Sequence, residues 1–187
     1  MDLHSHIEKI LWTQDQISRR VSELASQISD DFCAIQPPPV VVGVATGAFV
    51  FLADLVRKID LLVPVDFVRA ESYGSGTESN GAPIISFDLK VDIKGRDVIL
   101  VEDIVDTGST LWCVIPHLES KGASSVSVCT FLDKPSRRKV NFDLLGKIKF
   151  YRGFECPDYF VVGYGMDFAE IYRNLPYVGV LKPEHYK

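Results

Sequence analysis

The chain has 187 residues, of which 47% are hydrophobic and 24% are charged. This length can bury a substantial core but is short for two independent domains, so we expect a single domain over residues 1–187. The formal net charge of −5 argues against a nucleic-acid partner. No apolar run approaches the roughly 20 residues of a membrane span, and the N-terminus lacks the apolar core of a signal peptide. We therefore expect a cytoplasmic protein with no membrane partner.

A helix is predicted near the N-terminus. Thr13 and Gln16 have the spacing of a capping box. The helix should end near Ser29, because an apolar stripe repeats at helical intervals up to that point, at Ile17, Val21, Leu24 and Ile28. His4 and His6 precede it, and we expect an exposed, frayed segment there rather than a metal site.

The next segments predict a βαβ unit. Residues 40–44 indicate a buried strand, residues 48–59 a helix and residues 62–68 a second strand, joined by a right-handed parallel crossover. The first strand meets the helix at Ala45-Thr46-Gly47, where backbone N–H groups and the helix dipole could bind an anion. This signal is weak by itself, because an ordinary tight turn has the same pattern.

Residues 72–82 form a polar, glycine-rich segment, and we expect a mobile loop there. Composition alone is equally compatible with an active-site lid and with a flexible surface loop. Residues 84–91 predict another strand after it.

The most informative stretch lies between residues 98 and 111. Val98–Val101 predicts a strand buried on both faces, and Glu102 and Asp103 fall at its carboxyl end, where open parallel sheets bind ligands. Asp106 follows, and Thr107-Gly108-Ser109-Thr110 then offers backbone N–H groups and hydroxyls to an anion. A helix should continue to about residue 120, kinked or shortened by Pro116.

Carboxylates beside a phosphate site would repel the phosphate unless hydroxyl groups or a cation lie between them. The pattern therefore predicts a phosphorylated sugar bound together with a divalent metal ion. The simpler alternative is an N-capped helix with solvent-facing acids, but three acids and four small residues would then coincide by chance.

The C-terminal part predicts further strands. Residues 126–132 indicate a strand, and Lys134 follows its end, where a lysine is usually just solvated surface. Residues 160–167 indicate a strand, a glycine-rich exit and an acid, Asp167. The alternation of elements predicts an α/β fold, with a core of about residues 36–150. Residues 151–187 are expected to form a small hood with residues 1–35.

Glu102-Asp103-Ile104-Val105-Asp106-Thr107-Gly108 resembles the phosphoribosyl-diphosphate (PRPP) motif of the type I phosphoribosyltransferases. Further segments between about residues 12 and 181 resemble the hypoxanthine-guanine branch of that family, and they occur in the same order as in that branch. The resemblance implies the type I fold, a mostly parallel twisted sheet flanked by helices with a small hood subdomain. It also implies Mg²⁺-dependent transfer of the 5-phosphoribosyl group from PRPP to N9 of hypoxanthine or guanine, a purine salvage reaction that yields IMP or GMP and diphosphate.

The resemblance assigns the PRPP-binding residues. Those for PRPP and its 5′-phosphate are Glu102, Asp103, Asp106, Thr107, Gly108, Ser109 and Thr110. Asp106 is the expected catalytic residue, an acid/base group at purine N7. Those for diphosphate are Thr46, Gly47 and Arg173, although Ala45-Thr46-Gly47 replaces the Leu-Lys-Gly of many members, so the lysine is absent. Ser72 and Tyr73 match the family's lid, which protects the sugar cation from water.

The resemblance also assigns the purine and metal sites. Lys134 would donate to the exocyclic oxygen of a 6-oxopurine, Phe160 would stack on the base and Val161 would bond it through its backbone. Asp167 completes the purine site. The metal ligands would be Glu102 and Asp103, with Asp167 holding a second metal ion. A homodimer or homotetramer is expected, although Trp12 and Phe32 are only weakly consistent with an interface.

Three alternatives remain open at this stage. A phosphoribosyltransferase for xanthine or a pyrimidine base would share the PRPP motif, but the pyrimidine enzyme should lack Lys134 and the 160–167 arrangement. A regulatory relative would sense PRPP and bind RNA or protein, which the acidic charge balance disfavours. A dinucleotide-binding domain is disfavoured because no GxGxxG follows the first strand.

Overall fold

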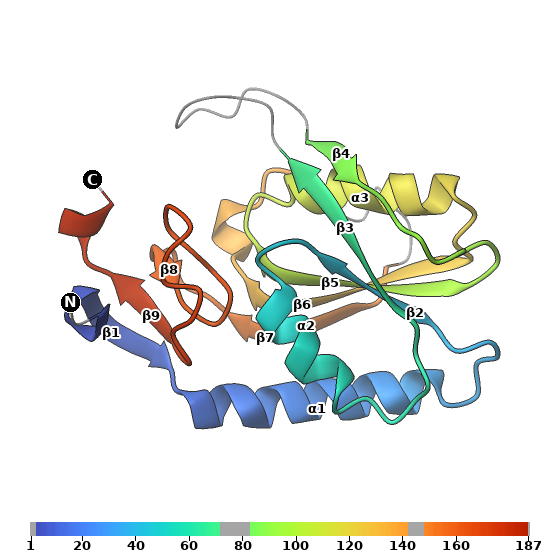
Figure 1. Ribbon diagram of the computed structural model, residues 1–187, viewed down its shortest axis with the longest axis horizontal. Coiled ribbons are helices and arrows are strands. Elements are labelled where there is room, and N and C mark those ends of the chain that lie inside the picture. Colours follow the sequence, from blue (N-terminus) through green and yellow to red (C-terminus); the bar gives the residue numbers. More distant parts are fainter. Residues whose placement is uncertain (1–2, 72–82, 142–147, 187) are drawn as a thin grey trace.

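A six-stranded sheet forms the centre of the computed structural model, which describes residues 3–71, 83–141 and 148–186 (Figure 1). The strand order is β4-β3-β2-β5-β6-β7. The bounds are β2 Val40–Val44, β3 Val65–Glu71, β4 Ile84–Phe87, β5 Asp97–Val105, β6 Ser125–Asp133 and β7 Phe150–Glu155. All neighbours are parallel except β4, which pairs antiparallel with β3. The predicted α/β fold with a mostly parallel sheet is confirmed.

Helices cover both faces of this sheet (Figure 1). Helices α1 (Gln14–Phe32) and α2 (Phe49–Val56) pack on one face, and α3 (Ser109–Ser120) packs on the other. Successive residues of β5 alternate between the two layers, as side chains of a strand must. Ile99 and Val101 belong to the core under α1 and α2, whereas Val98 and Leu100 belong to the core under α3. Burial on both faces explains the unbroken apolar run in the sequence.

The N-terminal helix begins as predicted and ends later. The Thr13 backbone N–H donates to Gln16 Oε1 at 2.9 Å, and the Gln16 N–H donates to Thr13 Oγ1 at 3.3 Å, which confirms the capping box. The helix continues past Ser29 to Phe32, because Phe32 is still buried in the core. Helix α3 runs through Pro116 and ends at Ser120, near the predicted end, so Pro116 does not shorten it.

Two strand predictions need correction in their bounds. The strand expected at residues 62–68 is β3, Val65–Glu71, because the chain is irregular as far as Pro64. The strand expected at residues 84–91 ends at Phe87, because the backbone N–H groups of Lys90 and Val91 donate to the carboxylate of Asp66 instead of to a strand.

A second, three-stranded antiparallel sheet joins the two ends of the chain, with the order β1-β9-β8 (Figure 1). Its strands are β1 Ile7–Trp12, β8 Val161–Val162 and β9 Val178–Leu181, flanked by the 3-10 turns η1 (Leu3–His6) and η4 (Pro183–His185). A third such turn, η2 (Pro135–Arg137), follows β6. We call this small sheet and its flanking segments the hood.

The structure places two segments differently from the expected hood of residues 1–35 and 151–187. Helix α1 packs its apolar stripe on the large sheet, and β7 pairs with β6 inside that sheet. The N-terminal segment is also held rather than frayed. His4 Nδ1 lies 2.6 Å from the hydroxyl of Tyr177, and His6 Nδ1 lies 2.8 Å from the hydroxyl of Tyr172. Across the described ranges, no helix combines the length and apolar character needed to span a membrane.

Candidate active site

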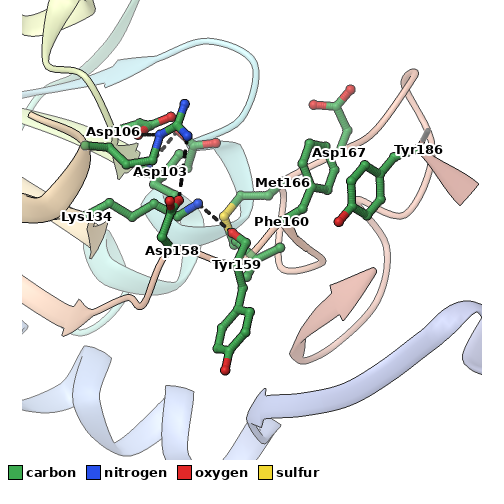
Figure 2. A pocket seen from close by; sticks show the side chains of 12 residues that line it. Asp103, Asp106, Lys134, Asp158, Tyr159, Phe160, Met166, Asp167 and Tyr186 are labelled. Atoms are coloured by element: carbon green, nitrogen blue, oxygen red, sulfur yellow. Dashed lines mark hydrogen bonds and ion pairs between the residues drawn. The ribbon is translucent and has the colours of Figure 1, made fainter. Parts of the chain in front are cut away.

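The large sheet and the hood face each other across a pocket of about 460 Å³ (Figure 2). One side comes from the carboxyl ends of β5 and β6, and the other comes from the chain around β8 and from the C-terminal turn. The lining residues are Asp103, Ile104, Asp106, Lys134, Arg137, Asp158, Tyr159, Phe160, Val161, Met166, Asp167 and Tyr186. Asp103 and Asp106 of the predicted sugar site therefore meet the predicted purine residues, which are far away in the sequence, in one cavity.

Two adjacent carboxylates lie at the base of this arrangement. Strand β5 extends beyond Val101 to Val105, so Glu102 and Asp103 lie within the strand rather than after it. Glu102 is buried, and within the described residues its Oε2 atom has no hydrogen-bond partner. Burial raises the pKa of Glu102 well above its ordinary value, and the charge of Asp103 raises it further. Burial also raises the pKa of Asp103. Such a pair favours a proton or a cation beside it.

The turn after β2 lies against these acids. A Cβ atom added at Gly47 would lie 2.0 Å from Asp103 Oδ2, so only glycine leaves room for the carboxylate. Thr46 accepts a hydrogen bond on Oγ1 from Nη2 of Arg69, at 3.2 Å. Arg69 lies near the carboxyl end of β3, the strand next to β2, and places a guanidinium where the turn itself carries no cation.

The loop after β5 has the form of a phosphate cradle. Gly108 precedes α3 with a φ of 87°, a left-handed conformation that favours glycine. The hydroxyls of Thr107 and Ser109 lie 3.0 Å apart, and the Ser109 N–H donates to Thr107 Oγ1 at 3.3 Å. A cavity of about 60 Å³ adjoins the loop and is also lined by Thr110. Backbone N–H groups, hydroxyls and the N-terminus of a 12-residue helix thus converge at one point.

Asp106 lies at the mouth of the pocket beside a cation. Arg137 donates from Nε to Asp106 Oδ1 at 2.9 Å, and its Nη1 lies 3.7 Å from Asp158 Oδ1. All three side chains line the pocket (Figure 2). Arg137 therefore orients a carboxylate that is still 40% exposed and open to a ligand.

The purine side contains a buried lysine and an open aromatic ring. Lys134 is only 7% exposed, so it is not the solvated lysine that its turn position suggests, and its Nζ donates to the Tyr159 carbonyl at 2.6 Å. Phe160 is 39% exposed, and Val161 is buried in β8. An ammonium group and an aromatic face in one pocket suit a flat heterocycle that carries an acceptor oxygen.

Asp167 and Arg173 are brought together on the hood. Arg173 Nη2 lies 3.1 Å from Asp167 Oδ1 and 3.0 Å from Glu170 Oε2, while its Nη1 donates to the Gly165 carbonyl at 2.8 Å. The positive charge of Arg173 also acts to lower the pKa of Asp103, against the larger effect of burial. The predicted diphosphate arginine and the predicted metal ligand are thus one ion pair near the β5 acids.

Two predicted site residues are not described by the structure, and three residues that were not predicted lie at the site. Ser72 and Tyr73 lie outside the described residues. Arg69, Arg137 and Tyr186 were missed by the sequence analysis, because each has an ordinary sequence context and reaches the site only through folding. The available signal was position: Arg69 lies near the carboxyl end of a strand, at the edge where ligands bind. Within the ranges that the structure describes, no cluster of three or more His, Cys, Asp or Glu side chains could hold a metal ion.

Comparison with known proteins agrees with this geometry. Residues 11–169 match the phosphoribosyl transferase domain family. The hypoxanthine-guanine phosphoribosyltransferase of Bacillus subtilis is 43% identical over 181 residues, which cover 97% of both chains. That of Staphylococcus aureus (strain Mu50) is 41% identical over 184 residues, or 98% of this chain and 99% of the relative. The chain also matches the bifunctional protein TilS/HprT of Listeria monocytogenes (strain F2365) with 41% identity, but spans only 27% of that protein.

A solved structure matches the whole architecture. The crystal structure of a hypoxanthine phosphoribosyltransferase from Staphylococcus aureus superposes with a TM-score of 0.88 at 41% identity, covering 99% of this chain and 97% of that one. The fold is therefore the type I phosphoribosyltransferase fold. The chain belongs to the phosphoribosyltransferase family and, within it, to the hypoxanthine-guanine phosphoribosyltransferases.

Proposed function

We propose that the protein transfers the 5-phosphoribosyl group from PRPP to N9 of hypoxanthine or guanine, releasing diphosphate and forming IMP or GMP. The observation that carries this proposal is the pocket itself, in which Asp103, Asp106 and Lys134 lie opposite Phe160, while the phosphate loop lines an adjoining cavity. A phosphorylated sugar on one side and a 6-oxopurine on the other would then meet at the atoms that react.

On the sugar side, the backbone and hydroxyl groups of residues 107–110 bind the 5′-phosphate at the N-terminus of α3. Glu102 and Asp103 orient the ribose hydroxyls. The diphosphate lies along the turn at Thr46 and Gly47, where Arg173 and Arg69 supply positive charge. Arg69 thereby contributes a guanidinium at a turn that lacks the lysine of many family members.

On the purine side, Lys134 donates a hydrogen bond to the exocyclic O6 atom, which favours 6-oxopurines over adenine. Phe160 stacks on one face of the base, and the backbone of Val161 bonds its edge. Asp106 accepts or shares the proton at N7 while N9 attacks the anomeric carbon. Departure of diphosphate leaves cationic character on the ribose. The carboxylates of Glu102 and Asp103, which lie beside the ribose, stabilise this positive charge.

The β5 acids fit a divalent cation, because a buried Glu102 oxygen lacks a partner among the described residues and burial raises both pKa values. Two carboxylates suit Mg²⁺, an ion commonly held by one or two carboxylates together with substrate oxygens. Glu102 and Asp103 would hold it, and Asp167, on the hood, would hold a second ion. When bound, Mg²⁺ neutralises charge on the leaving diphosphate.

The first test is diphosphate release by the purified protein with Mg²⁺ and PRPP, offering hypoxanthine, guanine, xanthine, adenine, orotate and uracil separately. Rapid release with hypoxanthine or guanine alone is expected. Release with xanthine or a pyrimidine would move the specificity to that base. No release with any base, despite PRPP binding, would favour the regulatory alternative, and an RNA gel shift at increasing salt would then test for a nucleic-acid partner.

We also propose a homodimer through the face around α2 and β3, with a homotetramer as the alternative. Four apolar side chains stay exposed there: Phe49 at 43%, Leu62 at 94%, Val65 at 41% and Phe67 at 37%. Trp12 and Phe32 do not form this face, because Trp12 stacks on Phe154 of the same chain and Phe32 is buried. Sedimentation velocity of the wild type and of a Leu62→Glu variant tests the proposal, and an unchanged species would contradict it. A cytoplasmic location stays a prediction.

A further inference from the structure

The C-terminal turn brings a second aromatic ring to the purine side of the pocket. The rings of Tyr186 and Phe160 have centroids 4.4 Å apart and planes inclined by 14°, which is a stacked pair. Phe168 meets the Phe160 ring edge-on, with centroids 5.5 Å apart and planes at 84°. Phe160 is therefore packed on one side, although the residue remains 39% exposed.

The orientation of this stack decides what it can do. Figure 2 shows the Phe160 ring between Tyr186 and the side of the pocket that contains Asp103, Asp106 and Lys134. Tyr186 thus covers the face of Phe160 that points away from these residues and leaves the opposite face available to a ligand. A base that stacks on Phe160 would be the third member of an ordered stack, with Tyr186 at its far end.

Tyr186 is itself held in place by the other end of the chain. The turn η4 is fixed to the N-terminal segment, because the Lys182 N–H donates to the His6 carbonyl at 3.0 Å and Lys182 Nζ donates to the Ser5 carbonyl at 2.6 Å. The rings of His6 and His185 are stacked with centroids 3.9 Å apart. The same C-terminal segment also holds the Phe160 backbone, whose carbonyl accepts from the Leu181 N–H at 3.0 Å.

We propose that Tyr186 is a positioning residue for the purine base, which holds the Phe160 ring parallel to the base before the base binds. This inference rests on the proposed stacking role of Phe160. A ring that is already ordered loses less freedom on binding, so the base binds more tightly. Because Tyr186 lies on the far side of Phe160 from Asp103 and Asp106 (Figure 2), it should act on the base and not on PRPP.

The test is steady-state kinetics on the full chain, with hypoxanthine and PRPP varied separately. Tyr186→Ala is expected to raise the KM for hypoxanthine by about 3- to 10-fold, the contribution of one aromatic pair. The kcat and the KM for PRPP should stay within about twofold, as for a loss of uniform binding. Tyr186→Phe keeps the ring and should behave as wild type. Glu184→Ala, an exposed change in the same turn, is the matched control.

A double-mutant cycle with Phe160→Ala tests whether Tyr186 acts through Phe160. If it does, the double variant should have the same KM for hypoxanthine as Phe160→Ala alone, within about twofold. If the increases in KM caused by the two single substitutions multiply in the double variant, the proposal is overturned. An unchanged KM for hypoxanthine in Tyr186→Ala would also overturn it. A lowered KM would also overturn it, because the ring would then compete with the base.

Two further outcomes keep this proposal separate from the function it rests on. If Phe160→Ala leaves the KM for hypoxanthine unchanged, the stacking role of Phe160 is wrong, and the positioning role of Tyr186 fails with it. If Tyr186→Ala melts well below the wild type, Tyr186→Leu replaces it, since leucine keeps the apolar volume without the aromatic face. If Tyr186→Leu melts like the wild type and has a wild-type KM for hypoxanthine, the positioning role of Tyr186 is wrong, while the proposed function still stands.

Discussion

At the scale of single residues, Asp106 carries the proposed proton transfer. It lies in the pocket 2.9 Å from Arg137 Nε, which orients it without covering it. Asp106→Asn should lower kcat by about 10²- to 10⁴-fold, the usual range for loss of a general acid-base group, as measured by rapid mixing. Asp158→Asn is the control, because Asp158 faces the same arginine and lines the same pocket. Near-full turnover in Asp106→Asn would exclude the role.

A second prediction concerns the space that Gly47 leaves for the Asp103 carboxylate. Its Cα approaches the Asp103 carboxylate so closely that an added Cβ would lie 2.0 Å from Oδ2. Gly47→Ala should displace this carboxylate and reduce kcat/KM for PRPP by about 100-fold, since a shift of about 1 Å can cost that much. Gly95→Ala is the control, because nothing lies within 4 Å of its added Cβ although its φ is 70°. It should lower stability alone, and wild-type kinetics in Gly47→Ala would refute the prediction.

At the scale of elements, Asp88 ties the segment after β4 to the end of α3. Lys121 Nζ lies 2.9 Å from Oδ2, and His117 Nε2 lies 3.0 Å from Oδ1. Burial alone would raise the pKa of Asp88, but the hydrogen bonds from Lys121 and His117 lower it to about 2. A lowered pKa in the folded state stabilises the protein above the ordinary value of 3.8, and this stability is lost as the pH falls toward 2.

The corresponding test is urea unfolding of Asp88→Asn between pH 7 and pH 2. At pH 7 the variant should be less stable by about 1 kcal/mol or less, because the carboxylate is 38% exposed and solvent screens it. The difference from the wild type should shrink between pH 4 and pH 2. Asp60→Asn, an exposed change elsewhere, should show no such convergence. A constant difference across this range would mean that the ion pairs do not account for the effect.

At the scale of the whole molecule, one buried ring connects the large sheet and α2 to the hood. Phe131 of β6 is fully buried, and its centroid lies 5.3 Å from Phe51 of α2, 5.7 Å from Phe154 of β7 and 4.7 Å from Tyr164 near β8. The hood is thus packed on the same core as the large sheet. We therefore propose that residues 1–187 form a single cooperative domain.

The two tryptophans test this cooperativity, because Trp12 ends β1 in the hood and Trp112 lies in α3 on the far layer. Single-tryptophan variants, Trp12→Phe and Trp112→Phe, should each show one fluorescence transition in urea, at the same midpoint as the circular dichroism of that variant. Phe131→Ala should lower the free energy of unfolding by about 3 to 5 kcal/mol. Both midpoints should then move together to a lower urea concentration. A hood signal that is lost first would divide the chain into two units.

Features that depend on neighbouring residues can be predicted from the sequence alone. The capping box at Thr13, the buried strand at residues 40–44 and the glycine before α3 follow from patterns a few residues long, so local geometry suffices to predict them. The PRPP motif lies on one strand, one loop and one helix start, and it was readable for the same reason. Its resemblance to a known family then supplied the remaining site residues.

Contacts between residues that are distant in the sequence are known only from the folded chain. Arg69 contacts Thr46 because β2 and β3 are adjacent, and Tyr186 contacts Phe160 because the C-terminal turn is held by the N-terminal segment. The burial of Lys134 and the packing of α1 on the large sheet have the same origin. These contacts depend on the order of the strands and on the path of the chain between elements. No short sequence pattern predicts them, because both are set by burial of the whole apolar surface at once.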